Sequence, residues 1–176
     1  MPASALRKVL YFVWFQTIWF LAILFTSEYL TIIGLLIAAF FILSPRKKTD
    51  LIMAAGIAVY GCIIDGALLW SGFFAFSDHE GWLIPIWLIS LWIAFGLMLR
   101  VSLDYLQGRY ALAAVLGAVS GPLSYYAGAQ AGAVIFPADT VLTLGILSAI
   151  WAVTVPLCLY ADAFLNGREG KTAAES

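Results

Sequence analysis

One carboxyl group stands out in the apolar part of the chain. Asp65 lies inside a long hydrophobic run, 14 residues past Leu51, or about 21 Å along a helix that rises 1.5 Å per residue. An acid at membrane depth costs on the order of 2.5–3.5 kcal/mol on insertion scales, so its side chain is expected to face protein or a wet cavity. The position indicates either a proton- or ligand-binding group or a structural hydrogen bond between helices, and both interpretations stay open.

Two tyrosines are predicted to reach that acid. Tyr125 and Tyr126 lie 16 and 17 residues past Arg109, on a helix expected to run in the same direction, so their hydroxyls come to a similar depth. A tyrosine hydroxyl can donate to a carboxylate, and no Lys or Arg is expected nearby, so a protonated Asp65 is compatible with this setting. The candidate intramembrane ligand site consists of Asp65, Trp70, Tyr125, Tyr126 and Gln130.

A second polar group lies at the end of another apolar run. Arg100 and Asp104 are four residues apart, with Ser102 between them, which is the spacing of an ion pair on one helix face. Such a pair contributes roughly a few tenths of a kcal/mol. A basic residue at a helix end that extends its head group to the membrane surface is the favoured interpretation, and a site for a substrate headgroup is the alternative.

The segment that carries the tyrosines, Ala113–Ala133, is predicted to be the central helix of the protein. Its small residues recur at helical spacing: Ala113, Gly117, Gly121, Ser124, Gly128 and Gly132. In lipid such a stripe lets two backbones approach closely, so it predicts a packing face that a second copy or a membrane partner could use. Pro122 lies within the stripe and is expected to loosen the helix.

The composition indicates a protein whose solvent is largely lipid. Of the 176 residues, 64% are hydrophobic and 11% charged, and the mean hydropathy is +1.00; a water-soluble domain of this length could not bury so much apolar surface. We predict an all-α, six-helix transmembrane bundle in residues 1–165 and a short polar cytoplasmic tail in 166–176. The six expected spans are Val9–Phe25, Tyr29–Leu43, a third that follows a cap at Thr49 or Asp50 and ends at Trp70, Trp82–Leu99 (with a possible interfacial extension to Leu106), the Ala113–Ala133 segment, and Thr140–Tyr160.

The basic residues predict the orientation. With six spans and an amino terminus inside, every Lys and Arg falls on the cytoplasmic side: Arg7, Lys8, Arg46, Lys47, Lys48, Arg100, Arg109, Arg168 and Lys171. The opposite loops carry only acids, Glu28, Asp78, Glu80 and Asp139, and the single histidine, His79, which is more readily a solvated loop residue than a pH sensor. Positive charge concentrated on one side predicts that both termini are cytoplasmic.

The sequence contains no pattern that assigns a reaction. It lacks H-E-x-x-H, G-x-S-x-G and P-loop motifs, and Cys62 and Cys158 belong to no metal or redox spacing. We therefore predict no metal, no cofactor and no nucleic-acid partner for a chain of net charge −1, with membrane lipids as the expected surroundings. Whether the protein is an enzyme stays open.

Several strings of residues resemble a bacterial inner-membrane family known as domain of unknown function 2878. They span about Val9 to Val134: Trp14-Phe15-Gln16 with Trp19-Phe20, Asp65 to Leu69, Trp87, Leu91-Trp92 and Phe95, Leu99, Ser102, Leu103 and Leu106, and Gly121 to Gly128 with Gly132-Ala133. The Gly-Pro-Leu-Ser-Tyr-Tyr-Ala-Gly string is the most specific. Family members usually carry an amide at the position of Arg100 and often a basic residue at that of Gln130. The resemblance therefore gives no support for a polar site shared with the family at these two positions.

The resemblance implies an inner-membrane location without an established activity, and an association with the physiology of membrane acyl chains. Three functions follow from the sequence. The first is the binding or processing of a lipid or other hydrophobic molecule in a cavity lined by Asp65, Trp70, Tyr125 and Tyr126. The second is a transporter component, of the size of a substrate-binding subunit. The third is a structural or assembly role in which the glycine stripe binds a partner.

Overall fold

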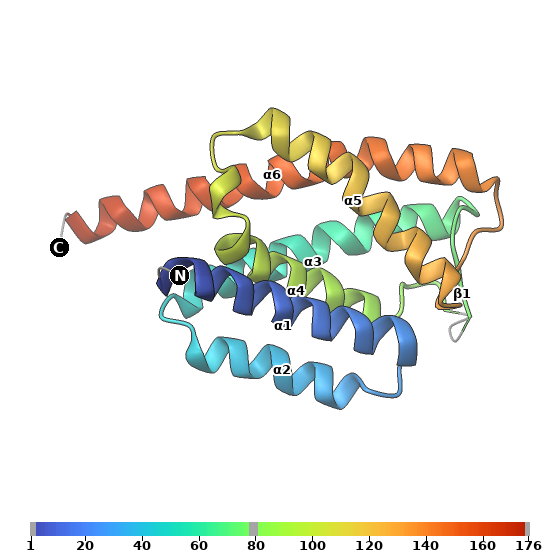
Figure 1. Ribbon diagram of the computed structural model, residues 1–176, viewed down its shortest axis with the longest axis horizontal. Coiled ribbons are helices and arrows are strands. Elements are labelled where there is room, and N and C mark those ends of the chain that lie inside the picture. Colours follow the sequence, from blue (N-terminus) through green and yellow to red (C-terminus); the bar gives the residue numbers. More distant parts are fainter. Residues whose placement is uncertain (1–2, 78–80, 175–176) are drawn as a thin grey trace.

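The chain folds into six α-helices within the part that the computed structural model describes, residues 3–77 and 81–174, with side chains described for 5–77 and 81–166. The helices are α1 (Ala3–Phe25), α2 (Leu30–Leu43), α3 (Lys47–Trp70), α4 (Ile86–Ser102), α5 (Tyr110–Gln130) and α6 (Thr140–Ala174). A 3-10 turn, η1 (Asp104–Leu106), follows α4, and two short strands, β1 (Ala75–Phe76) and β2 (Val134–Ile135), lie in the connections. The predicted helical fold class is confirmed (Figure 1).

Four of the described helices, α1, α3, α5 and α6, are long and apolar enough to cross a membrane, and α2 and α4 are shorter apolar helices. Large hydrophobic side chains cover the outside of the molecule, among them Leu10, Leu35, Val59, Val115 and Val141. An exterior of this kind is unfavourable in water and suits a hydrocarbon solvent. The chain therefore has the properties of an integral membrane protein.

The helices lie side by side, and both ends of the chain lie at the same end of the molecule (Figure 1). The main packing partners are α5 with α6, α3 with α4, and α1 with α4. Helix α4 is the most buried of the six: its residues 94 to 100 are all buried. The prediction that Ala113–Ala133 forms the central helix is therefore wrong, because α5 packs mainly on α6, whereas α4 contacts α1, α2, α3 and α6.

The glycine stripe of α5 packs against α6 of the same chain. A Cβ atom added to Gly117 would lie 2.3 Å from the backbone oxygen of Trp151, and one added to Gly121 would lie 2.1 Å from the Trp151 ring. The two glycines thus let the indole lie directly on the α5 backbone. Gly132 has a different role, since its φ of +83° ends the helix in a conformation that glycine adopts without strain.

Pro122 is buried inside α5, and the helix continues through it from Tyr110 to Gln130. Proline has no N–H to offer to the carbonyl one turn earlier, which is that of Ala118. The Ser148 hydroxyl, from α6, donates to this Ala118 oxygen at 2.7 Å. The neighbouring helix therefore supplies the hydrogen bond that the proline removes, as is common where proline occurs in membrane helices.

The connections at the end opposite the termini are joined by the two strands. They pair antiparallel, with Ala75 opposite Ile135 and Phe76 opposite Val134. The preceding residue, Phe74, is 2% exposed and stacks on Tyr125, with ring centroids 5.1 Å apart. The strand pair thus closes that end of the bundle above the Tyr125 ring.

Several predicted helix boundaries differ from the structure, and three of them have a clear consequence. Helix α4 begins at Ile86 rather than at Trp82, because Pro85 occupies its N-cap position in an extended conformation. Helix α3 begins at Lys47, and the side chain of Asp50 is used inside the bundle rather than as a cap. Helix α6 continues to Ala174, so the segment predicted as a polar tail from residue 166 is helical over most of its length. The predicted loop residues Asp78, His79 and Glu80 lie outside the described residues.

Candidate functional site

Asp65 is completely buried on α3 and accepts hydrogen bonds from two other helices. The Tyr125 hydroxyl, from α5, donates to its carboxyl group, 2.7 Å from Oδ1 and 2.8 Å from Oδ2. The Trp92 indole N–H, from α4, donates to Oδ2 at 2.7 Å. A buried carboxyl group needs such partners, and here the donors fix the relative rotation of three helices.

Two stacked indole rings lie beside this acid, and each packs on a glycine of a neighbouring helix. Trp92 and Trp151 stack with centroids 5.2 Å apart and planes 10° from parallel. A Cβ atom on Gly61 would lie 2.2 Å from the Trp92 ring, and one on Gly121 would meet the Trp151 ring in the same way. Each indole therefore lies on the bare backbone of a neighbouring helix, Trp92 on α3 and Trp151 on α5. This close packing holds the Trp92 N–H in line with Asp65.

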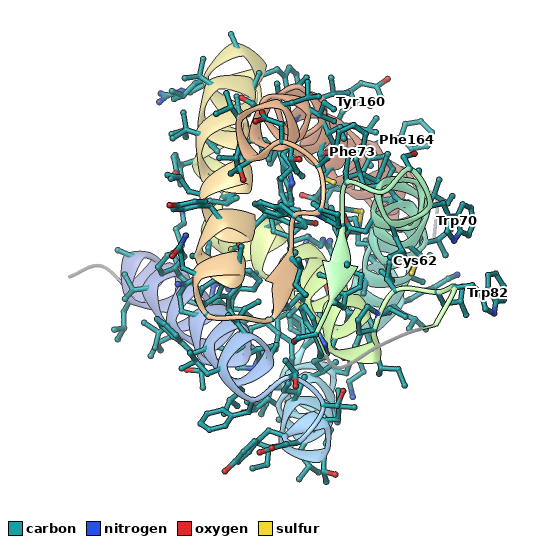
Figure 2. All side chains as sticks on the ribbon, turned by 90° about the vertical axis from the view of Figure 1, so that its right-hand side faces the viewer. Cys62, Trp70, Phe73, Trp82, Tyr160 and Phe164 are labelled. Carbon is teal, nitrogen blue, oxygen red and sulfur yellow. The ribbon has the colours of Figure 1, made fainter. Side chains whose placement is uncertain are left out.

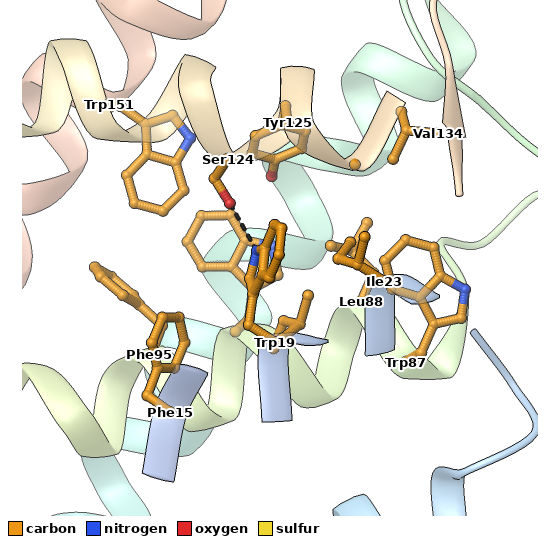
Figure 3. A pocket seen from close by; sticks show the side chains of 13 residues that line it. Phe15, Trp19, Ile23, Trp87, Leu88, Phe95, Ser124, Tyr125, Val134 and Trp151 are labelled. Carbon is orange, nitrogen blue, oxygen red and sulfur yellow. Dashed lines mark hydrogen bonds between the residues drawn. The ribbon is translucent and has the colours of Figure 1, made fainter. Parts of the chain in front are cut away.

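A cavity of about 60 Å³ lies beside these rings, between α1, α4, α5 and α6. Figure 3 shows its lining residues, which are mostly aromatic and aliphatic: Phe15, Trp19, Ile23, Trp87, Leu88, Leu91, Trp92, Phe95, Ser124, Tyr125, Gly128, Val134 and Trp151. Polar groups are few, chiefly the hydroxyls of Ser124 and Tyr125 and the indole N–H of Trp19. An apolar cavity with a small number of fixed polar groups is the usual form of a small-molecule site.

The cavity opens between α1 and α5. Helix α1 packs mainly on α4, and α5 on α6, whereas α1 and α5 meet through few residues. Among these, the Trp19 indole donates to the Ser124 hydroxyl at 2.9 Å (Figure 3). Trp19 and Ser124 keep partial exposure, as do Phe15 and Trp151 on the cavity wall. The cavity wall is therefore least completely covered between these two helices.

The structure brings together only part of the predicted ligand site. Asp65 and Tyr125 are joined, but Asp65 does not line the cavity; it lies behind the wall that Trp92 and Tyr125 form. Trp70 is 67% exposed and donates to the backbone oxygen of Trp82, and both rings point away from the bundle (Figure 2).

Tyr126 and Gln130 are also on the exposed side of α5. Trp70, Tyr126 and Gln130 therefore do not join Trp92 and Tyr125 in the hydrogen-bond group of Asp65. Tyr126 follows Tyr125 directly, and a turn of 100° per residue carries it to another face of the helix.

Sequence reasoning missed Trp92 as a hydrogen-bond donor to Asp65. For a tryptophan in an apolar run, the sequence pattern does not show whether the ring only packs or also donates its N–H in a hydrogen bond. The depth of the residue would have been the usable signal, since Trp92 lies on a helix that runs opposite to α3. Its position, seven residues into α4 from the end opposite the termini, corresponds to that of Asp65, five residues before the end of α3.

The predicted pair of Arg100 with Asp104 does not form. Arg100 instead extends into the bundle, where its guanidinium binds Asp50 of α3 and Asp162 of α6, the latter at 2.6 Å. Asp104 pairs with Lys8 at 2.5 Å, and the Ser102 hydroxyl donates to the Lys8 backbone oxygen. The reason is burial: only 2% of the Arg100 side chain is exposed, and a buried charge needs direct partners.

The described residues contain no group of three His, Cys, Asp or Glu side chains placed to hold a metal ion. Cys62 and Cys158 are free thiols. The single histidine, His79, lies outside the described residues.

Comparisons with known proteins give a family but no activity. A family model described as "Protein of unknown function (DUF2878)" matches residues 8–157, which is most of the chain. No curated protein and no solved structure matches.

Proposed function

This chain belongs to the family of unknown function DUF2878, and we propose that it binds a lipid or another hydrophobic small molecule in the cavity beside Asp65. We also propose that it is a multi-pass protein of a bacterial inner membrane, with six spans and both termini in the cytoplasm. The orientation is supported by the basic residues, which gather at the end of the molecule where the chain begins.

One observation carries the binding proposal: the two donors that hold the buried Asp65, Trp92 and Tyr125, also form the wall of a partly open apolar cavity. Packing alone would not require a carboxyl group here, because an apolar residue of similar size avoids the cost of burying it. The acid instead fixes the orientation of both rings, and therefore the shape of the cavity. Asp65 is on this view a positioning residue.

The size and lining of the cavity limit what it can hold. About 60 Å³ is well below the roughly 300–1,000 Å³ of sites that enclose a drug-sized ligand. The cavity can take the end of an acyl or isoprenoid chain or a small ring, while the rest of the ligand stays in the bilayer between α1 and α5. The Ser124 hydroxyl at the opening can orient one polar group of such a ligand.

The proposal is tested by filling the cavity. Gly128 lines it, and a Cβ atom there would make ordinary contacts of 3.4 Å with Ile23 and 3.5 Å with Val134. Gly128→Leu therefore places the rest of the leucine side chain in the cavity. Gly56→Leu is the matched control, because Gly56 is an exposed helical glycine with nothing within 4 Å.

The measurement is mass spectrometry of the hydrophobic molecules that remain with each protein after purification in a mild detergent. We expect a compound that is retained by the wild type and by Gly56→Leu and lost from a folded Gly128→Leu. Asp65→Asn is expected to reduce retention of the same compound, because the amide N–H₂ would face one of the two donors. Retention that is equal in all four proteins would show that the cavity binds nothing.

A further inference from the structure

A second, larger cavity lies at the other end of the bundle. Its volume is about 360 Å³, within the range of small-molecule sites. It lies where α2 ends and α3 begins, and side chains from α1, α4 and α6 complete its walls. Unlike the cavity beside Asp65, it is lined by charged groups: Arg7, Arg46 and Arg100, with Asp50, Asp104 and Asp162. This cavity is separate from the site of the proposed function, since Asp50 and Asp65 are about 22 Å apart along α3.

Most polar groups in the buried part of this cavity are already paired. Arg100 binds Asp50 and Asp162 and also donates to Asn166 at 3.1 Å. The remaining oxygen of Asp50 accepts from Ser44, and that of Asp162 accepts from Gln107 and Asn166. These two carboxylates therefore offer little to a cationic ligand, and the network forms a fixed, polar base.

Much of the unused hydrogen-bonding capacity of the cavity belongs to arginine side chains. Arg46 donates from Nη1 to Asn166 at 3.0 Å, which leaves most of its N–H groups free. Arg7, on α1, is exposed and forms no hydrogen bond or ion pair within the described part of the chain. Asp104, the third acid, is neutralised by Lys8. With Lys8 included, four cationic side chains surround the cavity against three carboxylates, so an anion would meet a net positive charge.

We propose that this cavity binds a phosphate group. Two guanidinium groups with free N–H donors, one on each of two separate elements, suit an anion with several acceptor oxygens, which arginine binds through paired hydrogen bonds. The phosphate can come from the headgroup of a lipid in the adjacent leaflet or from a soluble phosphate compound. The cavity lies at the end of the helices, level with a headgroup layer, and is open to both.

The test compares three probes on the purified full-length protein in neutral detergent: dihexanoyl phosphatidic acid, glycerol 3-phosphate and inorganic phosphate. Binding is measured by titration calorimetry at fixed ionic strength. The variant is the double substitution Arg7→Gln with Arg46→Gln, both at exposed positions. The control is Arg109→Gln, which removes an exposed arginine at the same end of the molecule that does not line the cavity.

We expect the wild type and Arg109→Gln to bind with equal affinity and the double variant to lose about tenfold or more, as removal of charge-assisted hydrogen bonds does. Binding of phosphatidic acid alone would identify a lipid ligand, and binding of glycerol 3-phosphate or inorganic phosphate a soluble one. Failure of all three probes to bind the wild type would overturn the proposal, as would an equal loss in Arg109→Gln, which would indicate surface charge alone. Neither result would bear on the cavity beside Asp65.

Discussion

The two buried acids of α3, Asp50 and Asp65, have hydrogen-bond partners of different kinds. Asp65 has only neutral donors, a phenol and an indole, whereas Asp50 shares a guanidinium with Asp162. A hydrogen bond from a neutral donor stabilises the fold less than one from a charged donor. Its loss nevertheless leaves a buried carboxyl oxygen without a partner, which costs more free energy than the bond itself contributes. The contribution of each donor to Asp65 can therefore be measured by removing it.

Tyr125→Phe removes one of these donors with little change in shape. We expect the free energy of unfolding to fall by about 1–3 kcal/mol, because a buried acid is left with Trp92 as its one described donor. The adjacent Tyr126→Phe is the control; Tyr126 is 41% exposed, and its variant should stay within about 0.5 kcal/mol of the wild type. Reversible unfolding in mixed detergent micelles, followed by tryptophan fluorescence, measures both. Equal effects of the two variants would contradict the assignment.

The sequence could predict the meeting of Asp65 with Tyr125, because both depths follow from a count of residues along two spans that run in the same direction. It could not predict the partners of Arg100. The four-residue rule that suggested Asp104 describes only one helix, whereas Asp50 and Asp162 lie 50 and 62 residues away along the chain. Contacts of that kind depend on how the helices pack, which periodicity does not determine.

At the scale of elements, the close approach of α5 and α6 depends on where side chains are missing. The spacing of Gly117 and Gly121 predicted a thin helix face, and the structure shows that α6 of the same chain occupies it through Trp151. Ser148 adds a hydrogen bond to the carbonyl that Pro122 leaves free. A stripe of small residues in a sequence does not say which helix will cover it, so the sequence predicted the face but not its partner.

Gly121→Ala tests this packing. The added methyl group would lie 2.1 Å from the Trp151 ring, so we expect the free energy of unfolding to fall by about 1–3 kcal/mol, as is usual for overpacking. In a Trp151→Leu background the same change should cost much less, because the obstructing ring is gone. Gly145→Ala, on α6 with nothing within 4 Å, should be neutral or stabilising by up to about 1 kcal/mol.

The same experiment separates packing within the chain from a partner interface. Packing within the chain predicts a loss of stability that does not depend on protein concentration. A Gly121→Ala protein of wild-type stability that has changed its oligomeric state, measured by light scattering, would instead assign this face to a partner.

At the scale of the whole molecule, the two ends of the bundle differ in chemistry. The end that carries the termini holds the buried Arg100 network and the exposed arginines, and the other end is closed by the β1–β2 pair and aromatic side chains. The positive-inside rule assigns the orientation of a membrane protein from an asymmetry of this kind. The asymmetry could be predicted from the sequence because it depends on which loop a residue belongs to and not on side-chain packing.

The proposed orientation predicts which positions can be labelled from outside the cell. In a background without the two native cysteines, Glu28→Cys and Ser77→Cys lie in exposed connections at the end opposite the termini, and Lys47→Cys and Arg109→Cys are exposed at the other end. A membrane-impermeant maleimide added to intact spheroplasts is expected to label the first pair only, and permeabilised cells should show labelling of all four.

The same experiment tests whether the two short helices cross the membrane. Helix α2 has 14 residues and α4 has 17, fewer than the ~20 that a hydrocarbon core requires. If α2 did not cross, Glu28→Cys and Lys47→Cys would be labelled from the same side, and the six-span arrangement would have to be replaced by one in which α2 lies within one leaflet.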